Sequence, residues 1–435
     1  MIRVRRIARR EDLLALFAMV FLADVAIGIQ RATFSLFASS LGATLTMIGF
    51  MGGTEGLTGL LLSVPVGSLS DRVNRRIVVG GGLLLFAASY LLCALTSNPY
   101  LLYPARILTG VGVASTFYLG LALVSDIADE PDRGLSIGLY TTCMGIGFAV
   151  GSGVGGRIAE DLGFSAAFQV ATVVVLASFV ILRWGPVRSA SQPQELATSQ
   201  AQSLSTRLAI LRREPVLLAA CIGNLGIAMA NEGATFNFFP LYAASLAIST
   251  AAIGSIFSAR MLSSSAVRLP TGALADLISS RYLMVGALAL SILVMFAIPF
   301  TSSSALLTLI MIGDGIAFGM YFTAGNAAIA EHSTTANRGI ATGLFIMAGS
   351  IGTTLGPIGL GAAAERWGLQ SVFWLTGAVL LVGLLVILYL QWQARPKALP
   401  SATGRQAGVG VRAPKEPETS SQTGHEPGAG ADVIE

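Results

Sequence analysis

Eight ionisable side chains fall inside long apolar stretches of this sequence. They are Asp24, Arg31, Glu55, Arg106, Glu232, Arg260, Arg268 and Asp314. A charge surrounded by apolar residues is costly, so such residues are functional candidates by default. Because acids and bases are mixed in the set, they could carry a proton, bind a charged ligand or pair with one another.

Asp24 is the first candidate for a proton site because it lies near the middle of its apolar stretch. Burial favours the protonated form of a carboxyl group and a nearby cation favours the ionised form, so a movable arginine could switch the proton on and off. Arg31 follows Asp24 by seven residues, which places both on one helix face about two turns apart. The alternative is a fixed ion pair that holds helices together.

Two further acids stand beside aromatic residues at helical spacing. Glu232 precedes Phe236 and Phe239, and Asp314 precedes Phe318 and Tyr321. An acid next to aromatic rings suits a lipophilic cation, although such stripes also occur in ordinary helix packing.

The other polar residues of the apolar stretches favour pairing or packing. Glu55 could pair with Arg31 or Arg106, for either structure or function. Arg268 is expected to extend toward an interface, whereas Asn224 and Asn231 share a face and favour hydrogen bonds to another helix.

The composition indicates a membrane protein, because 54% of residues are hydrophobic, 11% are charged and the mean hydropathy is +0.73. Residues 282–313 and 367–394 contain no charge, and each run exceeds the roughly 20 residues that cross a bilayer. The apolar pattern predicts twelve spanning helices, near 13–37, 45–66, 77–97, 100–124, 134–156, 163–183, 215–243, 251–271, 282–300, 304–329, 339–363 and 369–393.

The basic residues predict the orientation of these helices. On this map 18 Lys and Arg lie on the side that holds both termini, against two, Arg157 and Arg366, on the other. The positive-inside rule therefore places both termini in the cytoplasm. We expect the first helix to remain uncleaved and the protein to reside in the plasma (inner) membrane.

Neither cysteines nor histidines predict a metal site or a disulfide. Cys93, Cys143 and Cys221 fall inside apolar helices, and His332 and His425 stand alone in positions expected to be solvated. No nucleotide-binding loop is found, so we expect neither a cofactor nor ATP as the energy source. The net charge of +4 does not indicate nucleic acid, because the arginines lie beside helix ends.

The chain contains an internal repeat. Residues 48–156 align with 253–361 without a gap and give 28 identities, among them Pro65/Pro270, Gly67/Gly272, Asp71/Asp276 and Arg76/Arg281. A duplicated six-helix half is a common plan of secondary transporters. We therefore expect a cytoplasmic arm at 1–12, helical bundles at 13–184 and 214–394, a flexible linker at 185–213 and a disordered tail at 395–435.

Three motifs resemble those of the major facilitator superfamily over about residues 13–394. The loop Gly67-x3-Asp71-Arg72-x-Asn74-Arg75-Arg76 is similar to the loop between helices 2 and 3 of that superfamily, and Arg106-x3-Gly110-x-Gly112 to its helix 4 motif. Helix 5 offers Gly138, Gly147, Gly151, Gly155 and Gly156, which resemble the motif of its antiporters with Ser152 in place of the usual Pro. The second half supplies Gly352, Gly356 and Pro357 at equivalent positions.

The resemblance implies an all-α membrane protein with two pseudo-symmetric six-helix bundles, in which helices 1, 4, 7 and 10 line a central cavity. It makes Arg106 the expected partner of Asp24. It also implies a latch in the outward-facing state, in which Asp71 faces the start of helix 11 near Arg338. The arginines Arg72, Arg75 and Arg76 would pair with Asp126, and Gly67 and Gly272 would permit close helix contact, with Asp276 in a weaker second latch. The alternative is a simple topogenic loop.

The favoured function is a monomeric, non-enzymatic transporter that exports a small lipophilic or cationic compound in exchange for protons. The open alternatives are metabolite uptake by symport or uniport, a different coupling ion such as sodium, and a membrane sensor or scaffold that transports nothing.

Overall fold

The computed structural model describes residues 7, 10–186, 214–275, 277–333 and 338–393. Within these ranges the chain is helical and contains no strand, and its long helices form twelve segments. The predicted linker and tail, apart from residues 185 and 186, lie outside the described residues together with His425 and Asp276.

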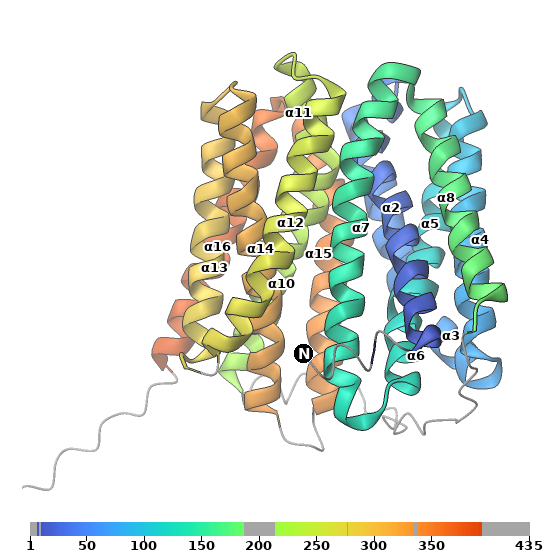
Figure 1. Cartoon of the computed structure of the whole chain (residues 1–435). Helices are drawn as coiled ribbons and strands as arrows, with labels where there is room; N and C mark the ends of the chain where they lie inside the picture. The colour runs from blue at the N-terminus through green and yellow to red at the C-terminus, as the bar shows by residue number, and fades with distance from the viewer. Residues whose placement is uncertain (1–6, 8–9, 187–213, 276, 334–337, 394–435) are drawn as a thin grey trace, which may run out of the picture. The chain divides into compact units, whose positions relative to one another are not determined.

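The first six segments contain residues 11–184 and form one side of the bundle in Figure 1. They are α2 (Glu11–Ser40), α3 (Leu45–Arg72), α4 (Arg75–Leu95), the joined run α5 (Leu102–Val113), η2 (Ala114–Tyr118) and α6 (Leu119–Ile127), α7 (Arg133–Leu162) and α8 (Phe164–Trp184). Short turns η1 (Pro99–Leu101) and η3 (Glu130–Asp132) precede α5 and α7.

The second six segments contain residues 215–393. They are the joined run α10 (Pro215–Met229), η4 (Ala230–Phe238) and α11 (Phe239–Ser245), then α12 (Thr250–Ala275), α13 (Ser280–Ala297) with η5 (Ile298–Phe300), α14 (Ser304–His332), α15 (Arg338–Trp367) and α16 (Gln370–Gln393). The prediction of twelve helices is confirmed.

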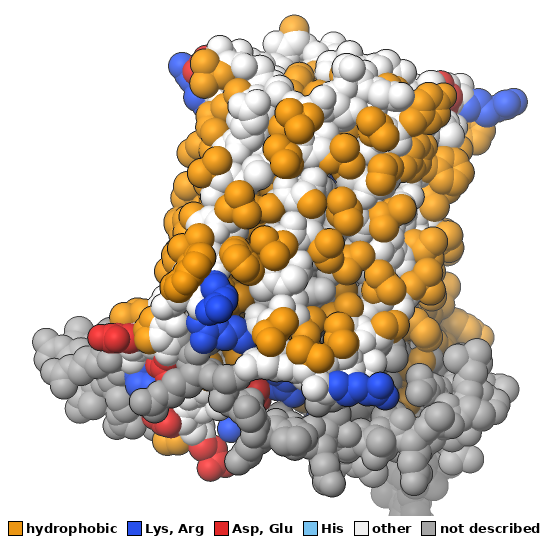
Figure 2. Space-filling view, turned by 90° about the vertical axis from the view of Figure 1, so that its right-hand side faces the viewer, with side chains coloured by type: hydrophobic (Ala, Val, Ile, Leu, Met, Phe, Trp, Pro, Cys, Tyr) orange, Lys and Arg blue, Asp and Glu red, His pale blue; other side chains and the backbone are white. Residues whose placement is uncertain are grey.

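The surface of the helices suits a lipid environment. Eleven of the described segments are long and apolar enough to cross a membrane, and α12, which carries Arg260 and Arg268, is not among them. Figure 2 shows hydrophobic side chains along the length of one face, with acidic and basic side chains toward its two ends. A band of this kind matches the hydrocarbon core of a bilayer.

The two halves touch at the end of the bundle opposite the start of α2 (Figure 1). A Cβ atom added at Gly254 of α12 would lie 3.0 Å from the Cα of Gly156 in α7, and one added at Gly49 of α3 would lie 3.0 Å from the Cα of Gly361 in α15. Both contacts therefore require glycine. They are equivalent under the sequence repeat, because Gly49 aligns with Gly254 and Gly156 with Gly361.

Two carboxylates close the same end of the bundle. Glu160 accepts a hydrogen bond from the backbone N–H of Ala251 at 2.7 Å, and Glu365 accepts one from Thr46 at 3.1 Å. Each carboxylate lies at the start of a helix of the opposite half, where the positive helix end favours an anion. These contacts are again related by the repeat, which explains why the duplicated sequence produces a symmetric closure.

At the other end the predicted close approach is absent. A Cβ atom added at Gly67, Gly272 or Gly138 would meet no described atom within 4 Å. The prediction that Gly138 packs against a neighbouring helix is therefore wrong for this conformation. The close contact at Gly67 and Gly272 belongs to a latch of the outward-facing state and stays a prediction. The side chain of Asp71 lies outside the described part of the chain, so its latch remains a prediction.

Candidate functional site

Buried charges from both halves meet at the centre of the bundle. Glu55 of α3 pairs through one carboxylate oxygen with Arg106 of α5 and through the other with Arg31 of α2, at 2.7 Å. Arg31 also reaches Glu232 of η4, in the second half, at 2.5 Å. Glu55 was expected to pair with either arginine, and the structure gives it both.

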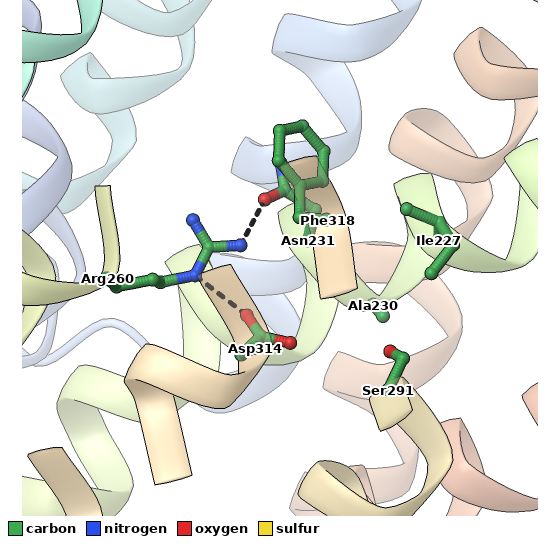
Figure 3. A pocket seen from close by; sticks show the side chains of 7 residues that line it. All are labelled: Ile227, Ala230, Asn231, Arg260, Ser291, Asp314 and Phe318. Carbon is green, nitrogen blue, oxygen red and sulfur yellow. Dashed lines mark hydrogen bonds and ion pairs between the residues drawn. The ribbon is translucent and has the colours of Figure 1, made fainter. Parts of the chain in front are cut away.

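The connection continues into the second half, as Figure 3 shows. Asn231 lies 3.4 Å from Glu232 and accepts a 2.7 Å hydrogen bond from Arg260 of α12. The Nε of Arg260 lies 2.7 Å from Asp314 of α14. We call the seven residues that share these contacts the charge network: Arg106, Glu55, Arg31, Glu232, Asn231, Arg260 and Asp314.

The two halves contribute matching ion pairs of opposite polarity. Arg260 stands 205 positions after Glu55, so an arginine of the second half replaces an acid of the first. Glu55 on α3 pairs with Arg106 on α5, and Arg260 on α12 pairs with Asp314 on α14. Both pairs join the second and fourth membrane segments of their halves. The repeat alignment reveals only the exchange of Glu55 for Arg260, because Arg106 aligns with Met311 and Asp314 with Thr109.

Aromatic rings separate the charges of the network. The guanidinium groups of Arg31 and Arg260 each lie 5.1 Å from the centre of the Phe236 ring. Phe148 and Phe257 pack 5.6 Å from the same ring. Cation–π attraction is strongest where water is excluded, so Phe236 both links the arginines and provides an apolar wall.

The backbone of η4 explains how one short segment supplies three of these residues. η4 is a π-helix, and such wider turns are frequent at functional sites. It contains Asn231, Glu232 and Phe236, and the Asn237 side chain donates a hydrogen bond to the Glu232 carbonyl. No feature of the sequence indicated the π-helix, and the pattern predicted a packing role for Asn231.

Asp24 stands apart from the charge network. Its side chain is 8% exposed and lies against Gly147 of α7, and within the described chain it has no hydrogen bond or ion pair. The prediction that Asp24 pairs with Arg106 is wrong for this conformation, because Arg106 forms its ion pair with Glu55. The buried hydroxyls of Tyr90 and Tyr140 likewise have no hydrogen-bond partner among the described residues.

Other candidates have packing roles. The Tyr321 hydroxyl donates to the Ala220 carbonyl at 2.8 Å, and the Asn224 amide donates to the Phe345 carbonyl at 2.8 Å. Both bonds join α10 to another helix, so these residues stabilise the bundle. Phe318 lies 5.5 Å from the Arg260 guanidinium, and Arg268 lies 5.4 Å from the Phe322 ring.

The basic loop after α3 holds neighbouring helix ends. Arg75 pairs with Asp126 at 2.5 Å, which confirms one of the predicted pairs, whereas Arg72 is exposed. Arg76 donates to the carbonyls of Leu182, Arg183 and Gly185 and thereby caps α8.

The second half repeats the arrangement of the basic loop. Ser280 donates to Glu331 at 2.7 Å, and Arg281 lies 3.1 Å from the His332 ring. His332 is the last residue of α14 and its side chain is 22% exposed, so it is partly solvated, but it does not stand alone because it contacts Arg281 of α13.

The glycines of the helix 5 motif bring α7 onto α2. Cβ atoms added at Gly147, Gly151 or Gly155 would collide with the backbone of α2, and Gly352 and Gly356 of α15 meet α10 in the same way. Gly156 meets Gly254, and the Pro357 carbonyl lies against Gly49. Apart from Gly138, the predicted packing glycines are confirmed. Cys93, Cys143 and Cys221 are free thiols, as expected.

One pocket adjoins the network in the second half. It holds about 160 Å³ and is lined by Ile227, Ala230, Asn231, Arg260, Ser291, Asp314 and Phe318. The side chains that line it leave no room for a water molecule, so the pocket is closed in this conformation. The Nη1 of Arg260, a residue 1% exposed, finds no hydrogen-bond partner among the described residues.

Curated relatives match parts of the chain. They include the inner membrane transport protein YajR of Escherichia coli (31% identical over 143 residues, 33% of this chain and 31% of the relative) and the human chromaffin granule amine transporter (26% over 190 residues, 42% and 35%). The quinolone resistance protein NorA of Staphylococcus aureus is 23% identical over 201 residues, 46% of this chain and 50% of NorA. The chain thus matches a third to a half of the length of these relatives.

Solved structures match more of the chain at lower identity. A bacterial homologue of the human lysosomal transporter Spinster, in an inward-facing and occupied conformation, aligns with a TM-score of 0.74 at 15% identity over 87% of this chain and 96% of the other. The nucleoside transporter NupG aligns with a TM-score of 0.70 at 17% identity over 88% of this chain and 99% of the other. These likenesses support the fold.

A family model covers nearly all the described chain, with matches at residues 16–244 and 224–424. The model is that of the Major Facilitator Superfamily. Two six-helix halves, the internal repeat and the central site agree with it, and this multi-pass membrane protein therefore belongs to the Major Facilitator Superfamily of transporters.

Proposed function

We propose that this protein is a secondary transporter of the plasma membrane that exports a small lipophilic or cationic compound in exchange for protons. The observation that carries the proposal is the buried Asp24, which has no ion pair or hydrogen bond within the described chain. An isolated carboxylate in an apolar interior is costly, so Asp24 is a natural proton carrier. Glu232, Asp314 and Phe236 would receive the cationic, apolar substrate.

The relatives support this direction of transport. One is named for amine transport and another for resistance to quinolones, and resistance to a compound fits its export from the cell. If both termini are cytoplasmic, the end closed by Gly156 and Gly254 faces outward and the opposite end faces the cytoplasm. We propose that the carrier works as a monomer, without a cofactor and without catalytic chemistry.

The test is ethidium accumulation in cells that lack their own efflux pumps. Cells with wild-type protein should accumulate less dye than cells with empty vector, and both a protonophore and Asp24→Asn should abolish the difference. Asp161→Asn, which alters an exposed carboxylate at matched expression, should export normally. Wild-type cells that accumulate as much dye as vector cells would remove the support for cation export.

Metabolite uptake is a second candidate because of Ser152. Its hydroxyl donates to the Phe148 carbonyl at 2.9 Å within an unbroken α7, where the antiporter motif has Pro. An outward proton gradient imposed on proteoliposomes distinguishes the two functions, since exchange and symport move the same substrate in opposite directions.

Asp71→Asn should slow transport roughly tenfold without weakening substrate binding, because the latch would form only in the outward-facing state. A tenfold change corresponds to about 1.4 kcal/mol between the two states. The measurement compares turnover in proteoliposomes with the dissociation constant in detergent. Unchanged turnover at equal reconstitution would show that residues 67–76 are only a topogenic loop.

A further inference from the structure

The charge network is electrically balanced before any ligand arrives. It contains three arginines, Arg31, Arg106 and Arg260, and three carboxylates, Glu55, Glu232 and Asp314, joined by contacts of 3.4 Å or less. In a low-dielectric interior an unpaired charge costs several kcal/mol. A ligand that enters the network must therefore replace each ionic contact that it breaks.

The contact most open to replacement is the one between the halves. Arg106–Glu55 lies within the first half and Arg260–Asp314 within the second. Among the described residues, Arg31–Glu232 is the ion pair that joins the halves. Since the substrate of an alternating-access carrier binds between its two halves, this pair is the ionic contact that a substrate bound there would part.

A simple cation satisfies only one side of the parted pair. If it binds Glu232, Arg31 retains Glu55 alone, and that carboxylate already holds Arg106. Two arginines would then share one carboxylate. A simple anion on Arg31 leaves Glu232 with the Asn231 amide as its nearest partner. A ligand that carries both charges gives each group a new partner and leaves the network neutral.

A proton carried by Asp24 could offset an incoming cation instead. Against this, Asp24 is joined to the network by no ion pair or hydrogen bond of the described structure. A proton on Asp24 would balance the total charge, but Arg31 would still lack a second carboxylate in contact with it. The two explanations differ in whether the ligand itself must carry an anionic group.

The walls at this contact indicate the rest of the ligand. Phe236 lies between Arg31 and Arg260, and Phe148 and Phe257 extend the apolar surface. Resting on the function proposed above, we propose that the substrate is amphoteric, with a cationic group for Glu232, an anionic group for Arg31 and a flat apolar body between Phe236 and its neighbours.

Two dyes that differ by one charge test the proposal. Rhodamine 110 carries a delocalised cation and a carboxylate, and rhodamine 123 is its methyl ester with the cation alone. Fluorescence anisotropy with the purified full-length protein in detergent gives a dissociation constant for each. We expect the acid to bind at least about tenfold more tightly than the ester.

Variants assign that preference to Arg31. Arg31→Gln should weaken the binding of rhodamine 110 until the dissociation constants of the two dyes agree. Arg31→Lys should restore the preference for rhodamine 110. Arg157→Gln, at an exposed pair, should retain it. Asp24→Asn should also retain it, because Asp24 lies outside the network. Size-exclusion profiles and thermal unfolding establish that each variant is folded.

Three outcomes would overturn the proposal: an ester that binds wild-type protein as tightly as the acid, an Arg31→Gln variant that weakens both dyes equally, or no binding of the acid. Failure of the proposed function has a different signature. It would appear as proteoliposome transport of neither dye in response to a proton gradient, whatever the binding preference.

Discussion

Replacing Glu55 with Gln is expected to destabilise the folded protein by about 3–5 kcal/mol, the usual cost of removing one member of a buried ion pair. Glu55 is 6% exposed and its two oxygens hold Arg31 and Arg106. The amide has the same shape but no charge, so both arginines lose their compensation. The measurement is the midpoint of unfolding in detergent, with unfolding induced by denaturant or by heat.

Two controls separate this effect from a general loss of charge. Asp161→Asn removes an acid from the Arg157–Asp161 pair, whose side chains are 70% and 53% exposed, and should cost less than about 1 kcal/mol. The double variant Glu55→Gln/Arg106→Gln removes an opposite charge together with Glu55 and should recover part of the lost stability. A single Glu55→Gln variant as stable as Asp161→Asn would show that the network contributes little to folding.

Much of the fold could be predicted from the sequence because the signals are one-dimensional. Charge-free runs longer than a bilayer crossing identify the helices, and the 205-residue repeat identifies the equivalent halves. The repeat also fixes the closed end, where Gly49/Gly361 and Gly156/Gly254 are symmetric contacts. Such features require no knowledge of which side chains meet.

Which acid pairs with which arginine at the centre of the bundle could be determined only from the three-dimensional structure. Asp24, Glu55 and Glu232 were all available to the arginines, and periodicity along one helix cannot decide which acid of another helix is nearest. The structure places Glu55 between Arg31 and Arg106 and leaves Asp24 beside Gly147. The π-helix η4 changes the register of Asn231, Glu232 and Phe236, and propensities for α-helix do not reveal it.

The sequence also specifies more than one state of a transporter, whereas the structure shows one. Gly67 and Gly272 have open space around them here, although their spacing resembles that of a latch. A motif that acts in the outward-facing state need not make its contacts when the opposite end is closed. The glycines of α7 avoid this ambiguity because Gly147, Gly151 and Gly155 lie within a single half.

Gly151→Leu is therefore expected to destabilise the protein by about 3 kcal/mol, near the upper range for overpacking a well-packed site. A Cβ atom at this position would lie 2.7 Å from the carbonyl carbon of Val25 and closer still to its oxygen. These are backbone atoms of α2, so a change of rotamer cannot relieve the collision. Thermal unfolding in detergent measures the loss, and ethidium export should fall with it because α2 carries Asp24 and Arg31.

The matched control lies in the same helix, thirteen residues earlier. A Cβ atom added at Gly138 meets no described atom within 4 Å, so Gly138→Leu should be neutral or stabilise the protein by up to about 1 kcal/mol, since leucine favours helix more than glycine does. The comparison holds the helix and the substitution constant and varies only the neighbouring backbone. If both variants were equally destabilised, the cost would come from the change in α7 itself, and the close α2–α7 contact would not be what positions Asp24 at the centre of the bundle.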